Sequence, residues 1–169
     1  CATDIGNAFL YGKTKERVYV IAGPEFGELE GQQLIIDKGL YGLKTSAARF
    51  HEHLAIKLRK LGFKPTLADT DFWIRKHDDH YEYIATYVDD LLVYSKDCQT
   101  IIDAIEKDYI LKGTGRPEYY LGGDVIQLDD QWENQGIKTA LSAKTYIENV
   151  TQKLEAMMGT RSFAMHNTP

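Results

Sequence analysis

The feature that most constrains this chain is the stretch YIATYVDDLLVYS at 83–95, in which two adjacent aspartates interrupt apolar and aromatic residues. β-branched and aromatic residues at this density favour strands, and the length of the stretch suits two strands better than one. The pattern therefore predicts a hairpin with Asp89 and Asp90 at its turn. Like charges repel each other there, so the pair requires a physical reason.

The residues alone leave two explanations open. Aspartate forms turns readily because its side chain bonds to nearby backbone groups, so the pair needs no function. Alternatively, adjacent carboxylates are tolerated where a divalent cation neutralises them. The second explanation requires another carboxylate from elsewhere in the chain. The candidate is Asp4, which ends a short apolar stretch before a glycine turn.

The rest of the chain alternates short strand and helix patterns, which predicts an α+β fold: an antiparallel sheet with helices on one face. Strands are expected at 1–5, 17–23, 32–37, 71–76, 81–88 and 90–95, with a late hairpin from 119–128 and 136–142. Helices are expected within 6–12, from Ser46 to Gly62, after a cap at Asp97, and before Gly159. The apolar positions expected on the faces of the three longer helices are Phe50, Leu54, Leu58 and Leu61, then Ile101, Ile102, Ile105 and Tyr109, then Tyr146, Val150, Leu154 and Met157.

The bulk composition is that of an ordinary globular protein. At 169 residues the chain is expected to form a single domain, with 43% hydrophobic and 27% charged residues. No apolar run approaches the roughly 18 residues that a membrane helix needs, so no membrane partner is expected. Without a signal peptide, and with only Cys1 and Cys98, the chain suggests no disulfide framework and an intracellular, reducing setting.

The charge balance gives two different indications about nucleic acid. The net charge of −5 counts against a binder that uses its whole surface, because phosphate contacts come mainly from Lys and Arg. However, the segment from Lys38 to Lys64 carries seven basic residues with Glu52 as its only acid. This segment is either a local basic surface or the solvated face of a helix.

Three ordered motifs carry a family resemblance. They are D-I-G-N-A-F-L at 4–10, K-G-L-Y-G-L-K at 38–44 and Y-V-D-D at 87–90. Together they resemble the reverse transcriptases of copia-type LTR retrotransposons, and the stretches at 67–73, 118–125 and 140–150 extend the resemblance over essentially the whole chain. The resemblance implies a polymerase palm with a ferredoxin-like core, part of the fingers and the start of the thumb.

The resemblance also implies a reaction and its metal site. The activity would be RNA-directed DNA polymerisation, in which two divalent ions assist nucleotidyl transfer from a dNTP to a primer 3′-OH. Asp4 and Asp89 would bridge two Mg²⁺ ions, with Mn²⁺ as another option. Asp90 would assist nearby and the backbone carbonyl of Ile5 would add a ligand.

Further residues are assigned to the nucleotide by resemblance. They are Phe9, Tyr41, Gly42, Lys44 and Lys112. Phe9 would pack under the sugar and exclude a 2′-OH, and the alternative is a core aromatic. Gly42 would allow the close backbone approach that a nucleotide needs. Lys112 would lie near the triphosphate and protonate pyrophosphate.

The residues assigned to nucleic-acid binding are Arg49, Tyr87, Val88, Leu121 and Gly122. Arg49 has the alternative of pairing only with Glu52. The Leu121-Gly122 pair has the alternative of a plain hairpin turn. The chain departs from the family at 45–47, where Thr-Ser-Ala replaces Gln-Ala-Pro, and Ser46 is expected to cap the following helix.

The implied partners are an RNA or DNA template-primer, dNTPs, and the RNase H and integrase regions of the same Gag-Pol polyprotein. The sequence is expected to be an excerpt of that polyprotein, whose element would assemble in a cytoplasmic virus-like particle. The excerpt is expected to be inactive without upstream fingers. Two alternatives are a degenerate or domesticated palm that binds nucleic acid without polymerising, and a structural α+β subunit with a coincidental Asp-Asp turn.

Overall fold

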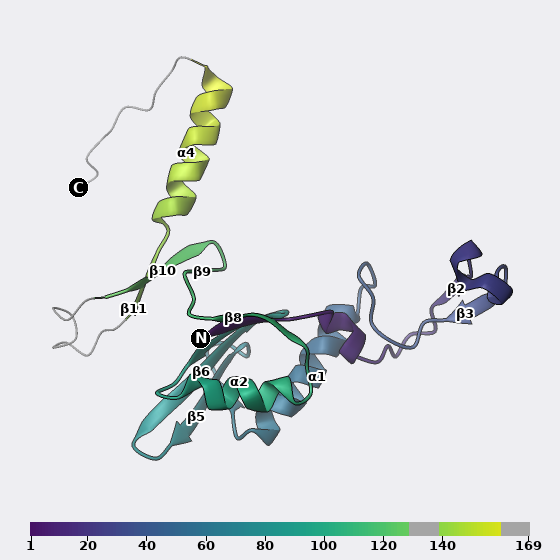
Figure 1. Ribbon diagram of the computed structural model, residues 1–169, viewed down its shortest axis with the longest axis horizontal. Helices are drawn as coiled ribbons and strands as arrows, with labels where there is room; N and C mark the ends of the chain where they lie inside the picture. Colours follow the sequence, from purple (N-terminus) through teal and green to yellow (C-terminus); the bar gives the residue numbers. More distant parts are fainter. Residues whose placement is uncertain (129–138, 160–169) are drawn as a thin grey trace. The chain divides into compact units, whose positions relative to one another are not determined.

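The computed structural model describes residues 1–128 and 139–159 and divides the chain into two compact units, Cys1–Gly115 and Arg116–Pro169 (Figure 1). Each unit is described separately below. The expectation of a single domain over 1–169 stays a prediction. No helix in the described ranges is both long and apolar enough to cross a membrane.

The first unit is built on an antiparallel sheet. In the described residues it has six strands in the order β4-β5-β6-β7-β1-β8. Their bounds are β1 (Ala2–Ile5), β4 (Lys64–Pro65), β5 (Phe72–His77), β6 (His80–Tyr87), β7 (Asp90–Tyr94) and β8 (Leu111–Gly115). The predicted strands at 1–5, 71–76, 81–88 and 90–95 are therefore confirmed. The first strand of the chain lies between β7 and β8, which begin only at Asp90 and Leu111.

Two helices, α1 (Ser46–Lys60) and α2 (Cys98–Glu106), pack on the same face of this sheet (Figure 1). Alternation along β7 directs Leu91 and Val93 toward the helices. The buried cluster consists of Ile5, Ala8, Phe50, Leu54, Ala55, Leu58, Phe63, Trp73, Ile84, Leu91, Val93, Ile101, Ile102, Ile105 and Tyr109. This packing confirms that Phe50, Leu54 and Leu58 of α1 and the three isoleucines of α2 face inward, and it confirms the predicted antiparallel α+β layout. Tyr109 is buried but lies beyond the end of α2, and Leu61 follows α1 and is half-buried.

The starts of the two helices differ from each other. The Asp97 side chain accepts a hydrogen bond from the backbone N–H of Thr100 at 3.2 Å, which confirms the predicted cap of α2. The expected cap at Ser46 is wrong. Its hydroxyl is buried and donates to the carbonyl of Leu40 at 2.7 Å, and Thr45 precedes the helix without a side-chain cap. Ser46 therefore fixes the loop before α1 instead of the helix end.

Cys1 and Cys98 form a disulfide across 97 positions of sequence. The two cysteines had suggested no disulfide framework from the sequence, and this bond corrects that expectation. The physical reason is the sheet order, because β1 lies beside β7 and α2 follows β7 directly. Backbone bonds in both directions between Cys1 and Val93 fix the end of β1 at this point.

Smaller elements of this unit are η1 (Ala8–Tyr11) and the antiparallel pair β2 (Tyr19–Ile21) and β3 (Gln33–Ile35), with η2 (Pro24–Leu29) between those two strands. They confirm the helical piece expected within 6–12 and the strands expected at 17–23 and 32–37. The strands β4 and β8 and the short helix η2 were not predicted from the sequence.

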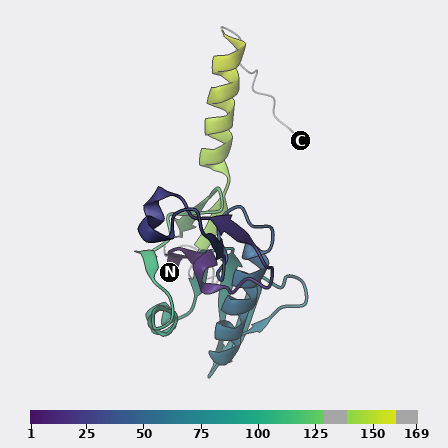
Figure 2. The ribbon, with the colours of Figure 1, turned by 90° about the vertical axis from the view of Figure 1, so that its right-hand side faces the viewer.

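The second unit contains β9 (Tyr119–Tyr120), β10 (Gly123–Gln127), β11 (Thr139–Ser142) and the helix α4 (Lys144–Met158). In the described residues its strands pair antiparallel in the order β11-β10-β9. The pairing of β10 with β11 confirms the predicted late hairpin, whereas the strand expected at 119–128 is divided by a turn at 121–122, and 136–138 lie outside the described residues. Figure 2 shows α4 as one continuous helix. None of its side chains is buried in the described part of the unit.

Candidate active site

The strand register brings the three candidate aspartates to one place in the sheet. Asp4 on β1 lies directly opposite Asp90 on β7, and the backbone N–H of Ile5 donates to the carbonyl of Asp89 at 2.9 Å. Residues directly opposite each other on paired strands project from the same face of a sheet. Since Ile5 is in the buried core, Asp4 and Asp90 project from the face opposite the helices.

The hairpin that carries Asp89 turns within two residues. Tyr87 and Asp90 are the last paired positions of β6 and β7, so Val88 and Asp89 form the loop. Val88 has a φ of 55°, in the left-handed region that β-branched residues rarely adopt. Tyr87 and Val88 are both exposed beside the aspartates.

Burial and neighbouring negative charge raise the pKa of two of the aspartates. The pKa of Asp4 is raised by burial and by the charge of Asp89, with which it also shares a side-chain hydrogen bond, while Lys112 acts in the opposite direction. The pKa of Asp90 is raised by burial and by the charges of Asp89 and Asp4. The group therefore carries negative charge that its surroundings do not fully compensate, which fits a hard divalent cation with oxygen ligands.

A lysine lies on the other side of Asp4. Lys112 on β8 is the register partner of Asp4, and the hydroxyl of Thr3 donates to its backbone carbonyl at 3.2 Å. The side chain passes so close to Gly6 that a Cβ there would lie 2.7 Å from its Cε. The site thus combines carboxylates with the ammonium group of Lys112, and Gly6 leaves room for the lysine side chain.

A second cluster of metal-binding side chains lies elsewhere in this unit. In 1–128 and 139–159, the one group of three such residues whose ligand atoms all lie within 4.8 Å of one another is His77, His80 and Glu82. The three aspartates do not form so tight a group. This cluster was not predicted from the sequence, although the H-D-D-H-Y-E spacing at 77–82 could have indicated it, because a two-residue turn pairs the two histidines.

Two of the residues assigned to the nucleotide, one from each of the first two motifs, are in contact. The rings of Phe9 and Tyr41 are 4.6 Å apart between centroids, with Phe9 packed at the edge of the core and Tyr41 exposed. Gly42 follows with a φ of 92°, a conformation that favours glycine, and Lys44 is exposed. Phe9 is therefore in contact with both the core and the second motif.

The basic segment at 38–64 is partly neutralised. Arg49 bonds to Glu52 at 2.8 Å, and Lys57 pairs with Asp108. The guanidinium of Arg59 lies 5.5 Å from the centroid of the Trp73 ring. These contacts agree with the solvated helix face rather than with a row of free cations. A role of Arg49 in nucleic-acid binding stays a prediction.

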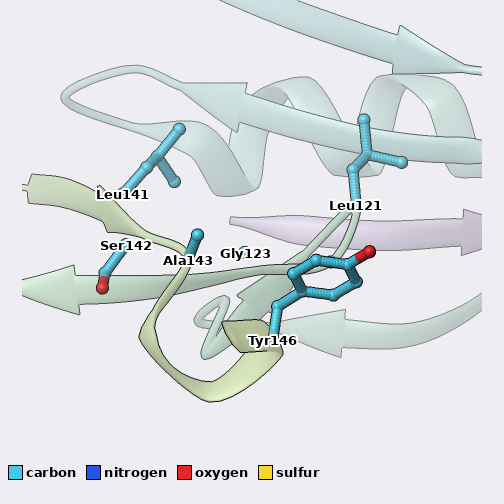
Figure 3. A pocket seen from close by; sticks show the side chains of 7 residues that line it. Leu121, Gly123, Leu141, Ser142, Ala143 and Tyr146 are labelled. Carbon is cyan, nitrogen blue, oxygen red and sulfur yellow. The ribbon is translucent and has the colours of Figure 1, made fainter. Parts of the chain in front are cut away.

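In the second unit, Leu121 and Gly122 form the two-residue turn between β9 and β10, with φ values of 48° and 86°. They border an open groove of about 480 Å³, which Gly123, Leu141, Ser142, Ala143 and Tyr146 complete. Figure 3 shows Leu121 and Tyr146 on one side of the groove and Leu141 on the other. The turn and the groove both lie within the second unit.

Comparison with known proteins gives one family. Residues 2–165 match the model described as reverse transcriptase (RNA-dependent DNA polymerase). A transposon Ty5-1 protein of Saccharomyces cerevisiae is 29% identical over 171 residues, covering 98% of this chain and 52% of that protein.

Two plant proteins are also similar. The retrovirus-related Pol polyprotein from transposon RE2 of Arabidopsis thaliana is 27% identical over 70% of this chain and 8% of its own length. That from transposon TNT 1-94 of Nicotiana tabacum is 26% identical over 89% of this chain and 11% of its own length. The chain thus spans about half of the yeast relative and about a tenth of the plant polyproteins.

Proposed function

This chain belongs to the reverse transcriptase (RNA-dependent DNA polymerase) family, as its copia-type motifs predicted, and we propose that it forms the palm-centred part of a retrotransposon polymerase. Its reaction would be attack of a primer 3′-oxygen on the α-phosphorus of a dNTP, with release of pyrophosphate. The observation that carries the proposal is the juxtaposition of Asp4 with Asp89 and Asp90, whose mutual repulsion favours cation binding.

Each residue of the site has a proposed role. Asp4, Asp89 and the carbonyl of Ile5 would hold two Mg²⁺ ions, with Asp90 adding negative charge beside them. When bound, such ions activate the primer hydroxyl and stabilise the leaving pyrophosphate. Lys112, the register partner of Asp4, would hold positive charge next to the triphosphate and supply a proton to the leaving group.

The test is carried out in the full-length parent protein. Asp4→Asn and Asp89→Asn are each expected to abolish Mg²⁺-dependent primer extension, because the variants remove charge but keep shape. The matched control is Asp103→Asn on the exposed face of α2. Circular dichroism checks that each variant is folded. Extension near that of the unaltered protein in either variant would reject the assignment.

The same assay separates the alternative function. A domesticated palm would bind template-primer without extending it even when all three aspartates are present. Binding of template-primer by the parent protein, measured together with extension, therefore distinguishes a polymerase from a nucleic-acid-binding remnant.

Phe9 is proposed to select the sugar. Its ring contacts Tyr41 beside the second motif, where a bulky side chain would exclude a 2′-OH. Phe9→Val is expected to raise ribonucleotide incorporation by the parent protein at least about tenfold, a change of roughly 1.4 kcal/mol in discrimination. Leu10→Val, on the exposed neighbour, is the control and should leave discrimination unchanged. Equal discrimination in both variants would reject the role of Phe9.

The remaining proposals concern the whole protein. The parent is proposed to be a Pol polyprotein with RNase H and integrase regions, which acts inside the cell in a virus-like particle. The 169-residue chain alone is expected to extend primers little or not at all. Processive cDNA synthesis by this chain would overturn that expectation.

A further inference from the structure

The β5–β6 hairpin carries three metal-binding side chains at its tip. His77 and His80 are the register partners that close the hairpin, and Glu82 follows two residues later. Cross-strand partners and residues two apart share one face of a sheet, so all three project to the same side. Their ligand atoms lie within 4.8 Å of one another.

Glu82 is a buried carboxylate that keeps a free coordination position. Its Oε2 accepts two bonds from Arg75, at 2.7 and 2.6 Å, and its Oε1 accepts one from Ser95 at 2.7 Å. Since a carboxylate has about four lone-pair sites, Oε1 retains one. The Nδ1 of His77 is 3.4 Å from this atom. Two ligands of a tetrahedral zinc ion, each about 2.0–2.1 Å from the metal, are separated by about the same distance.

His80 is oriented by a second carboxylate. Its Nδ1 lies 3.0 Å from Oδ1 of the Asp79 carboxylate, which also accepts hydrogen bonds from Lys96. An ionised acceptor places the imidazole proton on Nδ1 and leaves the lone pair on Nε2. That Nε2 is buried and has no hydrogen-bond partner in the described part of the chain. Metal-binding histidines are held by carboxylates in this way.

The charge around the cluster also suits a cation. Asp79 contacts His80 at 3.0 Å, and a carboxylate oxygen of Asp78 lies 3.9 Å from Nε2 of His77. Two positive groups lie nearby. Lys96 is bound to Asp79, and Arg75 is bound to the other oxygen of Glu82 and to the carbonyl of Leu61. The site therefore keeps its Oε1 side open.

We propose that His77, His80 and Glu82 form a zinc site, with a fourth position left for water. Imidazole ligands favour Zn²⁺ over Mg²⁺, whereas the all-oxygen aspartate group favours Mg²⁺, so the two sites select different ions. The zinc ion would tie β5 to β6 at the free end of the hairpin. The site is independent of the polymerase assignment, because it shares no residue with the aspartate group.

The test is direct Zn²⁺ binding by the full chain, after chelator treatment and at pH 7.5. Competition with a chromophoric chelator should give one tight site and a rise in Tm, since a ligand of the folded state stabilises it. His77→Ala and His80→Ala should each lower the affinity at least about 100-fold, more than the loss of an outer partner. His51→Ala is the matched control, because His51 contacts Asp71 at the base of the hairpin, at the end opposite the cluster.

The role of Asp79 is tested with two variants, each of which removes one negative charge from the same turn. Asp79→Asn should weaken zinc binding by about 10–100-fold, because it releases the His80 ring, whereas Asp78→Asn should have a smaller effect. The Tm measured without zinc shows whether each variant is folded. Because the His77 side chain is about half exposed, its replacement by alanine should not unfold the protein. Zinc affinity that is equal in the unaltered, His77→Ala and His80→Ala proteins, or no zinc binding at all, would overturn the proposal.

Discussion

At the scale of single residues, the aspartate group breaks an ordinary rule of sheet pairing. Like charges directly opposite each other on neighbouring strands are destabilising, yet Asp4 lies opposite Asp90, with Asp89 next to both. Val88 adds a left-handed β-branched residue at the same turn. Local departures of this kind concentrate at functional sites, where binding compensates their cost.

The first prediction at this scale concerns Asp4 in metal-free buffer. Because its pKa is raised in the folded protein above the usual 3.8, the stability linked to its protonated form is present below about pH 4 and is lost as the pH rises through the raised pKa. At pH 7, Asp4→Asn should therefore increase the free energy of unfolding, by on the order of 1 kcal/mol. The gain should disappear toward pH 3.5, as followed by thermal unfolding with a chelator present.

Two comparisons make this outcome specific. Asp103→Asn, on the exposed face of α2, should leave the unfolding free energy nearly unchanged at both pH values. Mg²⁺ should stabilise the unaltered protein more than the Asp4→Asn variant. A variant that is less stable than the unaltered protein at pH 7 would show that Asp4 is held by favourable contacts and not strained by repulsion.

At the scale of elements, the β5–β6 hairpin depends on one buried ion pair. Glu82 is 2% exposed and Arg75 is 24% exposed, and the guanidinium also lies 4.5 Å from the centroid of the Phe63 ring. Removing one partner of such a pair leaves a buried charge without compensation. Arg75→Ala should therefore destabilise the protein by about 2–4 kcal/mol, somewhat less than for a fully buried pair, as measured by urea unfolding.

The control is Lys76→Ala, an exposed neighbour on the same strand, with an expected change within about 0.5 kcal/mol. A double variant isolates the pair, because Arg75→Ala combined with Glu82→Gln removes the unpaired charge. It should be more stable than the sum of the two single changes predicts. Additive changes would mean that Arg75 acts through its contacts with Phe63 and with the carbonyl of Leu61, and not through Glu82.

The elements that the sequence predicts well are those whose signal is local. The periodic spacing of Phe50, Leu54 and Leu58 predicts α1, and Asp97 predicts the start of α2. The strand β8 was missed because LKGTG contains two glycines and one apolar residue, so it has no alternation. Its pairing with β1 is made over more than a hundred residues, and no local pattern encodes such a contact.

The candidate site likewise combines a local sequence signal with a long-range contact. Asp89 and Asp90 stand out locally because they interrupt a strand pattern, but their proximity to Asp4 depends on β1 entering the sheet beside β7. Its position before a glycine turn made Asp4 a candidate, and the family resemblance assigned it to the same metal site as the hairpin aspartates. Conversely, His77 and His80 are close in sequence, and the turn between them was predicted. That the two side chains project from the same face of the hairpin was not predicted.

At the scale of the whole molecule, the hydrophobic core belongs to one of the two units. All residues of the buried cluster lie between Ile5 and Tyr109, and the disulfide of Cys1 and Cys98 is within the same unit. In the described part of the second unit, Val125 is the one buried hydrophobic residue, and α4 buries none. A unit of this kind has little apolar burial to offset its chain entropy.

The prediction at this scale is that residues 1–115 fold alone. They should unfold cooperatively with a Tm within about 5 °C of the full chain, since the core and its disulfide are retained. Residues 116–169 alone should show no cooperative transition, because the free energy gained by burying Val125 is far below the entropy cost of ordering the segment. Calorimetry of the two fragments and the full chain tests both statements. A fragment 1–115 without a cooperative transition would mean that the second unit contributes to the stability of the first. The single domain expected from chain length would then describe the molecule better than two units.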